Sequence, residues 1–353
     1  MKNKTVQNVI GIDLGDKKHA VCVIDKDGTI LKEFSIRNQF NDLSKMVRDF
    51  PGVRVAMEVG THSPWISRYL TNEGMEVIVA NARKLRAIYT NDRKCDELDA
   101  RILAKFARID PELLHPITHR SEQAQRDALA ISLRDTLVRQ RVNMINSVRF
   151  SLKSLGIRLP SPSCSAFAKQ ARSFLQDYPE LLPAIEPLLC SLNELTDQIK
   201  HYDKAILNIA KTQYPQALKL QQITGIGPIT SLSFILTIED PSRFKDPRDI
   251  GAYLGLIPRR DQSGDTDKQL PISKTGNKHL RQLLVQSAQY ILGHWGPDCD
   301  LRRHGLKIAA RGGKAAKRKA LIAIARKLAV LMLVMWQNQS DYQPLRYPER
   351  NAA

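Results

Sequence analysis

The chain has 353 residues, enough for two or three domains and a sizeable core, which excludes a single small module. Its 54 lysines and arginines against 36 acidic residues give a formal net charge of +18. That excess indicates a polyanionic partner, with nucleic acid as the first candidate and an anionic membrane surface as the second. The five cysteines are dispersed without a CxxC pair, which favours reduced thiols in a cytoplasm over disulfides or a zinc site.

The membrane alternative has little support in the sequence. The longest apolar tract, Ala320 to Trp336, is interrupted by Arg326 and Lys327 and is shorter than a membrane span. The first residues, MKNKTVQNVIGID, lack the apolar core of a signal peptide. We therefore expect no membrane partner and a cytoplasmic protein.

The first hundred residues alternate between short apolar runs and helical patterns. Strands are predicted over residues 9–14, 20–24, 29–34, 53–58 and 75–80, and the second and third are joined by a tight turn at Asp27-Gly28. Helices are predicted over residues 43–50, from Ser63-Pro64 to Gly74, and over residues 94–107. This order predicts an α/β domain with a mixed sheet.

Four acidic residues stand out in this part. Asp13 and Glu58 come at or near the ends of buried-looking strands, where a parallel pairing would bring them side by side. Asp96 and Asp99 are three residues apart on one helical face, beside an apolar stripe that we expect to contain Leu98, Ile102, Phe106 and Ile109. Alternatively, Asp13 is a turn residue beside Gly15, and the helical pair is a solvated face.

Four carboxylates from two strands and one helix are the arrangement that two divalent ions need. Mg²⁺ prefers oxygen ligands, and two ions about 4 Å apart activate an attacking oxygen and stabilise a leaving one. This is phosphodiester chemistry. The cations just before the helical pair are expected where a phosphate backbone approaches, although solvated surface side chains are the alternative: Arg83, Lys84, Arg86, Arg93 and Lys94.

The middle of the chain predicts two long helices. One covers residues 121–155 and ends before Gly156. The other has a heptad pattern of apolar residues from Ile185 to Ile209, which is typical of a coiled coil. The sequence leaves open whether the two helices pair with each other or with another subunit. In both cases the segment is a spacer or an oligomerisation arm.

The last third contains two motifs of interest. The stretch ITGIGP places Gly225 and Gly227 in a turn that exposes backbone N–H groups and a helix N-terminus to a DNA phosphate; an ordinary tight turn is the alternative. The stretch GLIPRRDQSG is predicted to be a loop. Arg259 and Arg260 could bind a phosphate that Ser263 attacks there, but an ordinary surface loop is the alternative, since serines beside glycine are common in such loops.

Further basic residues follow these motifs. Lys274 and Lys278 lie before and at the start of a predicted helix that also contains Arg281. The region from Arg302 to Lys327 is the most basic part of the chain, with Gly312-Gly313 as a joint. Such a cluster indicates a surface for a nucleic-acid backbone, with Lys314, Lys317, Arg318 and Lys319 as candidate contacts. The residues after Asn338 are expected to be loosely held.

Taken together, these motifs resemble the DEDD transposases and site-specific invertases of insertion sequences, whose transposing members are bridge-RNA-guided recombinases. The resemblance runs from about Val9 to Trp336. The matching pieces, in order, are GID, AMEVGTHSPW, KCDELDAR, TGIGP, DPSRF, AYLGLIPRRDQSG and ISKTGNKHLRQLL. No single piece is decisive, but their order and spacing together are specific.

The resemblance implies a RuvC-like, RNase H-fold domain over residues 1–118, in which Asp13, Glu58, Asp96 and Asp99 bind Mg²⁺. A coiled-coil arm over residues 119–214 and a mainly α-helical transposase domain over residues 215–340 would follow, with a flexible tail over residues 341–353. In such a protein Ser263 forms a covalent phosphoserine link to DNA. The resemblance also implies a homodimer or homotetramer with composite active sites, and a bridge RNA that pairs with donor and target DNA.

Two local departures from the family pattern are visible. Cys95 replaces a small polar residue at a position that is not a ligand, and the stretch DTDKQLP after Ser263 is acidic for the family. The sequence therefore predicts a transposase that cuts and rejoins DNA by metal-assisted transesterification. The alternatives are a site-specific invertase of the same family, a metal-dependent junction-resolving nuclease that does not use Ser263, and a non-catalytic nucleic-acid scaffold.

Overall fold

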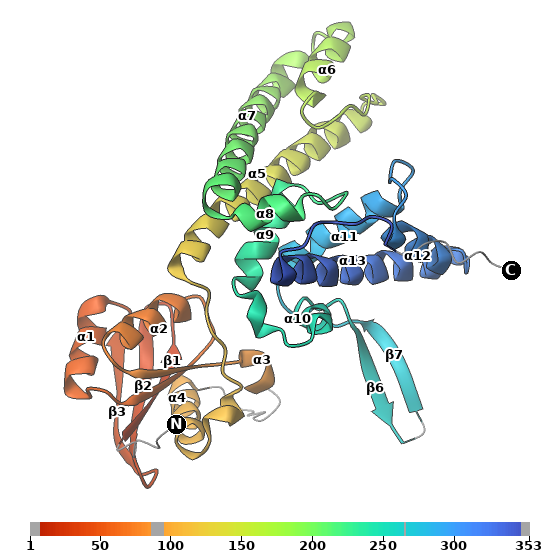
Figure 1. Ribbon diagram of the computed structural model, residues 1–353. Coiled ribbons are helices and arrows are strands. Elements are labelled where there is room, and N and C mark those ends of the chain that lie inside the picture. The colour runs from red at the N-terminus through yellow and green to blue at the C-terminus, as the bar shows by residue number, and fades with distance from the viewer. Residues whose placement is uncertain (1–7, 86–94, 265, 347–353) are drawn as a thin grey trace, which may run out of the picture. The chain divides into compact units, whose positions relative to one another are not determined.

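The computed structural model describes residues 8–85, 95–264 and 266–346 (Figure 1). By its internal contacts the chain divides into two compact units, residues 1–120 and residues 121–353. Each unit is described by itself.

The first unit is built on a five-stranded sheet with the order β3-β2-β1-β4-β5. The strands are β1 (Asn8–Leu14), β2 (Lys18–Asp25), β3 (Ile30–Arg37), β4 (Arg54–Glu58) and β5 (Glu76–Ala80). The first three strands form an antiparallel meander, whereas β4 pairs with β1 and β5 in parallel. The predicted mixed sheet is confirmed, and with its helices it forms an RNase H-like domain.

Helices cover both faces of this sheet. Side chains alternate along each strand, so that Ile10, Ile12 and Met57 pack in one core with residues of α1 (Phe40–Asp49) and α2 (Ser63–Asn72). Val9, Ala56 and Ala80 point to the opposite face, which is covered by α4 (Asp96–Ile109). Two short elements complete the unit, α3 (Ala82–Leu85) and the 3₁₀ turn η1 (Pro111–Leu114).

The buried face of α4 differs from the predicted apolar stripe. The helix buries Ala100, Leu103, Ala104 and Ala107, whereas Ile109 is 63% exposed. The reason lies in β1, where a Cβ atom on Gly11 would be only 2.0 Å from the carbonyl oxygen of Ala100. The helix backbone lies directly on the strand, so small side chains must face the sheet and the large apolar ones flank the contact.

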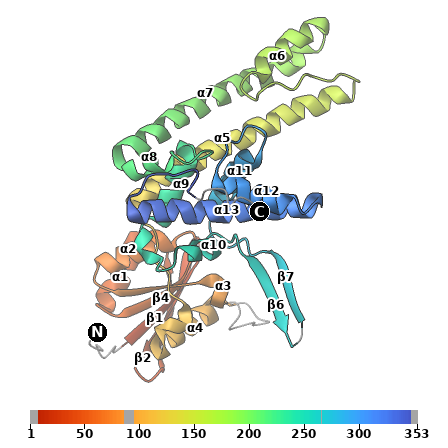
Figure 2. The ribbon, with the colours of Figure 1, turned by 45° about the vertical axis from the view of Figure 1, so that its right-hand side comes forward.

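The second unit begins with an arm of two long helices, α5 (Glu122–Lys153) and α7 (Leu182–Gln213), which Figure 2 shows lying side by side. Ile145, Val148 and Leu152 near the end of α5 share a core with Ile185 and Leu189 near the start of α7, so the helices are antiparallel. The two helices therefore pair with each other, which the sequence left open. Between them lie α6 (Phe167–Phe174) and the 3₁₀ turn η2 (Leu175–Asp177).

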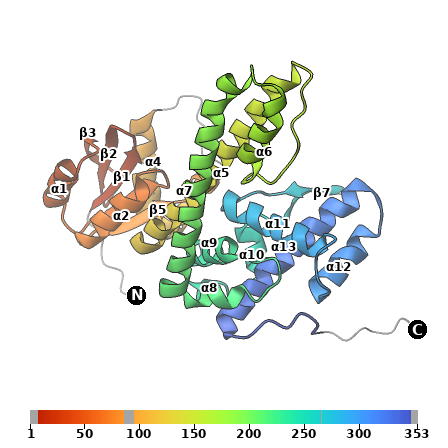
Figure 3. The ribbon, with the colours of Figure 1, turned by 90° about the horizontal axis from the view of Figure 1, so that it is seen from above.

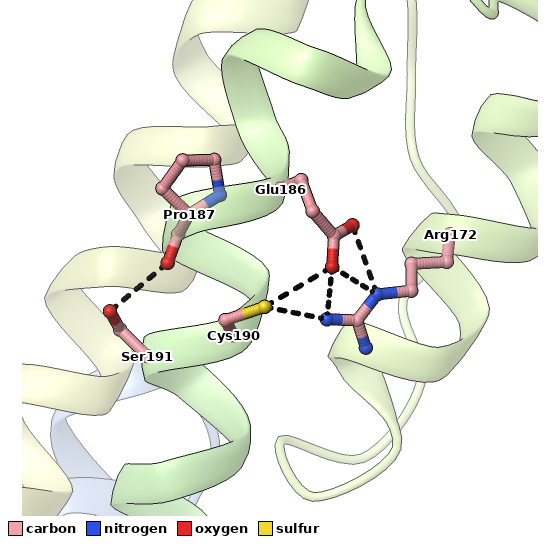
Figure 4. A network of polar contacts seen from close by, with 5 residues as sticks. All are labelled: Arg172, Glu186, Pro187, Cys190 and Ser191. Atoms are coloured by element: carbon pink, nitrogen blue, oxygen red, sulfur yellow. Dashed lines mark hydrogen bonds and ion pairs between the residues drawn. The ribbon is translucent and has the colours of Figure 1, made fainter.

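Polar contacts tie α6 to α7 near the tip of the arm (Figure 4). The Arg172 guanidinium bonds the Glu186 carboxylate through Nε and Nη2, with an Nη2–Oε1 distance of 2.7 Å. The Cys190 thiol donates to the same carboxylate at 3.2 Å. Pro187 lies inside α7, and the Ser191 hydroxyl donates to its carbonyl oxygen at 3.0 Å.

The rest of the second unit is a helical core. Its α-helices are α8 (Pro215–Leu220), α9 (Pro228–Ile238), α10 (Ile250–Tyr253), α11 (Lys278–Leu292), α12 (Asp300–Ala309) and α13 (Gly313–Asn338), with the 3₁₀ turns η3 (Pro241–Arg243) and η4 (Pro247–Asp249). All nine residues of α9 from Thr230 to its end at Ile238 are buried, and Figure 3 shows α11 and α12 lying along α13. The mainly α-helical C-terminal part is confirmed.

By length and composition, α13 is long and apolar enough to cross a membrane. The sequence had predicted that its apolar tract is too short and too charged for this. Half of its most apolar window is buried inside the unit, and Leu328, Met332 and Leu333 are fully buried in the main core. A core helix of a globular protein has these same properties, so the helix by itself is weak support for a membrane span.

Two segments differ from the sequence expectations. The stretch predicted as a loop around Ser263 forms a two-stranded antiparallel ribbon, β6 (Pro258–Ser263) and β7 (Thr266–Ile272). Residues 341–346, expected to be loose, are docked: the Asp300 amide donates to the Pro344 carbonyl at 2.8 Å, and the Tyr342 amide to the Gln222 side chain at 2.9 Å.

Candidate active site

The parallel pairing of β1 and β4 brings two of the predicted acids to one edge of the sheet. Ile12 is the register partner of Met57, so the next residues along both strands are Asp13 and Glu58. By the alternation of side chains, both acids belong to the face that carries Val9 and Ala56, which is the face covered by α4. Both are partly accessible to solvent.

The acids of α4 belong to the same edge. Arg54, at the start of β4, donates through Nη1 to the carbonyl of Ala107 at 2.9 Å, so the C-terminal end of α4 lies where β4 begins. The helix therefore runs opposite to β1 and β4, and its N-terminal turn, with Asp96 and Asp99, lies toward the strand ends. At 100° per residue these two acids lie in line with the buried positions Ala100, Leu103 and Ala107.

Charged contacts fix α4 in this position on the sheet. The Arg101 guanidinium forms an ion pair with Glu33 of β3, with an Nη2–Oε2 distance of 2.7 Å. This contact lowers the pKa of the Glu33 carboxyl, since the hydrogen bond from Arg101 favours the charged form. The Arg108 Nη1 group donates to the Lys26 carbonyl in the β2–β3 turn at 3.1 Å.

The assignment of Asp13, Glu58, Asp96 and Asp99 as metal ligands stays a prediction. Within the described parts of the chain, no three His, Cys, Asp or Glu side chains lie close enough together to hold a metal ion. The chemistry of the four candidates fits Mg²⁺, because all of them are carboxylates and Mg²⁺ prefers oxygen ligands. Each Mg²⁺ ion is usually bound by one or two carboxylates and completes its coordination with water. The fold directs all four candidates to one edge and one face of the sheet.

A hydrogen-bond network that the sequence interpretation missed lies at the same strand ends. His62, in the turn after β4, contacts Asp16, in the turn after β1, with an Nε2–Oδ1 distance of 3.1 Å. The Trp65 indole Nε1 donates to His62 Nδ1 at 3.3 Å. His62 and Trp65 belong to the THSPW stretch, whose pattern could have drawn attention to them.

Ser263 lies at the tip of the β6–β7 ribbon in the second unit. Its register partner is Thr266, and every residue of β6 is exposed. Gly264, next to Ser263, has a φ of +53°, which suits a glycine in a tight hairpin turn. The ribbon thus presents the serine hydroxyl on an exposed tip.

The two arginines predicted to bind phosphate on β6 differ in their surroundings. Arg260 forms a bidentate pair with Asp267 of β7, with 2.7 Å for both Nε–Oδ1 and Nη2–Oδ2. This hydrogen-bonded pair lowers the pKa of Asp267. Asp267 belongs to the acidic DTDKQLP stretch, so this stretch partly neutralises the positive charge of the β6–β7 ribbon. Arg259 is exposed on the same strand.

Gly225 and Gly227 form the turn before α9 and border an open depression of about 460 Å³ that is also lined by Thr230, Gln286, Ser287 and Tyr290. Gly225 has a φ of +87°, and a Cβ atom there would lie 3.3 Å from the Ser287 carbonyl of α11. A glycine is therefore required for both the turn and its close packing on α11.

The remaining predicted nucleic-acid contacts are exposed with one exception. Arg83, Lys84, Lys274, Lys278, Lys314, Lys317, Arg318 and Lys319 are all exposed. Arg281 is buried, and its Nη1 donates to the carbonyls of Leu254 at 3.0 Å and Thr275 at 2.5 Å. Because it stabilises the chain around α10, we leave Arg281 out of the nucleic-acid surface. Arg93 and Lys94 lie outside the described residues.

Comparison with known families gives two matches along the chain. A family model of DEDD transposases of the IS110 kind, described as "Transposase", matches residues 10–157. A second model, described as "Transposase IS116/IS110/IS902 family", matches residues 217–304. The first contains the sheet and its acids, and the second contains the glycine turn, the β6–β7 ribbon and α11.

Individual relatives agree with these matches. The transposase for insertion sequence element IS1328 of Yersinia enterocolitica is 30% identical over 288 residues, covering 80% of this chain and 83% of the relative. The transposase for insertion sequence element IS1111A of Coxiella burnetii is 26% identical over 351 residues, covering 95% and 91%. A pilin gene-inverting protein of Moraxella bovis is 30% identical over 135 residues, covering 38% and 41%.

Proposed function

The chain belongs to the IS110 family of DEDD transposases, and from this premise we propose that it cuts and rejoins DNA by metal-assisted transesterification through a covalent phosphoserine at Ser263. The observation that carries the proposal is the register of β1 and β4, which supports a carboxylate site at one edge of the sheet. A DNA-binding enzyme of this family also explains the net charge of +18.

In the proposed reaction the Ser263 oxygen attacks a DNA phosphate. A bond forms between this oxygen and phosphorus, and the bond from phosphorus to one ester oxygen of the DNA breaks. The serine hydroxyl gives its proton to water, and the leaving oxygen takes up a proton from water. A hydroxyl end of another strand then attacks the phosphoserine and releases the serine. Each step exchanges one phosphoester for another, so strand exchange needs no ATP.

Asp13, Glu58, Asp96 and Asp99 are the residues proposed to hold Mg²⁺. When bound, the metal supplies Lewis-acid stabilisation of the charge that develops on the phosphate oxygens. The four carboxylates have the separate task of bringing their oxygens to one edge of the sheet, which α4 supports by its close contact with Gly11. Their negative charge would repel the DNA without a cation between them.

Several partners belong to the proposal. We infer a homodimer or homotetramer with composite active sites, in which the acids come from one subunit and Ser263 from another, and a bridge RNA that chooses donor and target DNA. The partly exposed leucines of the arm, such as Leu129 and Leu133 on α5, are candidates for contact with a second copy. The protein would act at the nucleoid in the bacterial cytoplasm.

We propose that each unit contributes its own nucleic-acid contacts. In the described parts of the chain these are Arg83 and Lys84 in the first unit and, in the second, Gly225, Gly227, Arg259, Arg260, Lys274, Lys278, Lys314, Lys317, Arg318 and Lys319. Arg260 would exchange its partner Asp267 for a phosphate, which costs little because both members of this ion pair are exposed to water.

The experiment is strand cleavage of a plasmid that carries the DNA flanking the gene, with the full chain, the flanking RNA and Mg²⁺. Wild type should give cut and rejoined products. Ser263→Ala and Asp13→Asn should each reduce cleavage by at least about 1,000-fold, because nucleophile and carboxylates act as a unit. Gln262→Ala, an exposed neighbour of Ser263 in β6, is the matched control and should cleave like wild type.

Other outcomes separate the alternatives. Cleavage that survives Ser263→Ala but not Asp13→Asn would support a junction-resolving nuclease that uses water. Full activity of both variants would support a scaffold. Inverted rather than transposed products would support a site-specific invertase, a candidate favoured by the likeness to the pilin gene-inverting protein of Moraxella bovis.

A further inference from the structure

We propose that His62 donates its Nε2–H to a backbone phosphate of the DNA strand that is cut, and that Asp16 occupies this donor only while no DNA is bound. The inference rests on the proposed function, since it requires DNA at the edge of the sheet where β1 and β4 end. It adds a substrate-contacting residue to the four acids and Ser263.

The first support is the fixed tautomer of His62. The Trp65 indole can only donate, and its Nε1 lies 3.3 Å from His62 Nδ1, so Nδ1 must be the acceptor. In the neutral ring the proton is then on Nε2, which lies 3.1 Å from the Asp16 carboxylate. A histidine whose ring orientation and tautomer are set by a second residue is prepared to donate at one atom.

The surrounding turn is equally fixed. The Gly60 amide donates to the Ser63 hydroxyl at 2.9 Å, and Ser63 is fully buried at the start of α2. The Ile66 amide donates to the His62 carbonyl at 3.2 Å, which ties the histidine to the first turn of the helix. Trp65 packs against Phe40 with 4.9 Å between ring centroids. His62 is therefore held in place without help from Asp16.

The second support is the nature of the present partner. The Asp16 side chain is 91% exposed, whereas that of His62 is only 25% exposed. A hydrogen bond to such an exposed partner contributes little to stability, because water competes for both groups, so another anion can replace Asp16. A phosphate oxygen has the same hydrogen-bonding character as the carboxylate oxygen and a comparable charge.

The third support is location. His62 follows Glu58 by four residues and Asp16 follows Asp13 by three, so their contact joins the two turns that leave the sheet directly after the two acids. His62 is also the N-cap residue of the ten-residue helix α2, which has no acidic residue in its first turn. The positive end of the helix dipole adds to the attraction for an anion at this place.

The test compares the two partners of one contact, in the cleavage assay described above. If His62 acts on DNA, His62→Ala should lower the cleavage rate about 10- to 100-fold, the effect of losing one hydrogen bond to a charged group that holds the substrate. Asp16→Ala should cleave at the wild-type rate or faster, because it removes the competing anion. His62→Gln, whose amide can donate near the position of Nε2, should recover part of the rate.

A second readout uses the DNA rather than the protein. Replacing single phosphates by uncharged methylphosphonates should weaken wild-type binding at one position near the cut, and His62→Ala should be insensitive to the change at that position alone. A contact that only ties two turns together predicts equal losses for His62→Ala and Asp16→Ala and no such position. That result, or wild-type cleavage by His62→Ala, would overturn the inference.

Asp13→Asn, measured beside these variants, separates the two proposals. If Asp13→Asn is inactive while His62→Ala cleaves normally, the inference about His62 fails and the proposed function stands. If Asp13→Asn cleaves normally, the proposed function fails, and the inference that rests on it fails as well.

Discussion

His19 shows how a single residue near the site responds to pH. It is fully buried in β2, and its Nε2 lies 3.2 Å from the Asn38 side-chain oxygen. Burial lowers the pKa of His19 below the ordinary value of 6.5, because a charged imidazolium would lose its hydration. Burial also lowers the pKa of His119, His279 and His304.

The first prediction follows from these four histidines. The unfolded chain takes up their protons near pH 6.5 and the folded chain does not, so the free energy of unfolding should fall as the pH decreases from 7.5 to 5.5. The slope should reach up to about 1.4 kcal/mol per pH unit for each histidine that stays neutral. Urea titrations of wild type and His19→Gln check this. An equal slope in both proteins would contradict the part assigned to His19.

At the scale of elements, the contact between β1 and α4 is the most demanding in the first unit. A Cβ atom on Gly11 would lie 2.0 Å from the Ala100 oxygen and 2.6 Å from the Ala104 nitrogen, both of them backbone atoms that cannot move aside alone. The same contact fixes the turn that carries Asp96 and Asp99. Stability of this unit and placement of the acids therefore depend on one glycine.

We expect Gly11→Ala to lower the free energy of unfolding of the first unit by about 3 kcal/mol, because the helix must move off the strand. The rate of DNA cleavage should also fall at temperatures where the variant stays folded, because the turn with Asp96 and Asp99 is displaced. Gly60→Ala is the matched control, since Gly60 has open space around its Cβ position and no positive φ. Thermal unfolding of the two variants checks this prediction. Equal stability of Gly11→Ala and Gly60→Ala would contradict the role assigned to Gly11.

The elements of the first unit could be predicted because their patterns are local. The hairpin turn at Gly28, the proline at the start of α2 and the alternation in the strands follow from sequence alone, and the parallel pairing of β1 and β4 is confirmed. The buried face of α4 could not be predicted, since it is set by the missing side chain at Gly11. The β6–β7 ribbon was missed because PRRDQS has no buried residue to give an alternating pattern.

The candidate site follows the same division. Asp13 and Glu58 could be proposed from their positions at strand ends, and the sequence also groups them with Asp96 and Asp99. Only the structure gives the direction of α4, which brings its N-terminal turn toward the same edge of the sheet. The contact between His62 and Asp16 could not be predicted, because it joins two segments far apart in the sequence through side chains, although the THSPW stretch could have drawn attention to His62 and Trp65. The buried position of Arg281 depends on tertiary packing and is equally invisible in a basic stretch of sequence.

For the whole molecule, the dominant property is the positive charge. Four exposed cations, Lys314, Lys317, Arg318 and Lys319, crowd the N-terminal turns of α13, which has no acidic residue in its first turn. Cations at this end of a helix oppose the helix dipole and cost stability in isolation. We propose that an external anion, the DNA backbone, compensates them.

We expect the binding constant for duplex DNA to fall steeply with salt. Replacing Lys314, Lys317 and Lys319 together by alanine should reduce the slope of log K against log salt concentration by about 3, one unit for each lost phosphate contact. Fluorescence anisotropy titrations at salt concentrations from about 50 to about 300 mM measure this slope. An unchanged slope would remove this turn from the DNA surface.

The central claim is that Ser263 becomes joined to DNA in a reaction that needs the four carboxylates. The most direct measurement is mass spectrometry of the protein after reaction with a nicked suicide DNA that cannot be rejoined. The account predicts a DNA-derived phosphate on the peptide that contains Ser263, formed with Mg²⁺ and absent in the Glu58→Gln and Asp99→Asn variants. Cut DNA with an unmodified Ser263 peptide would contradict it.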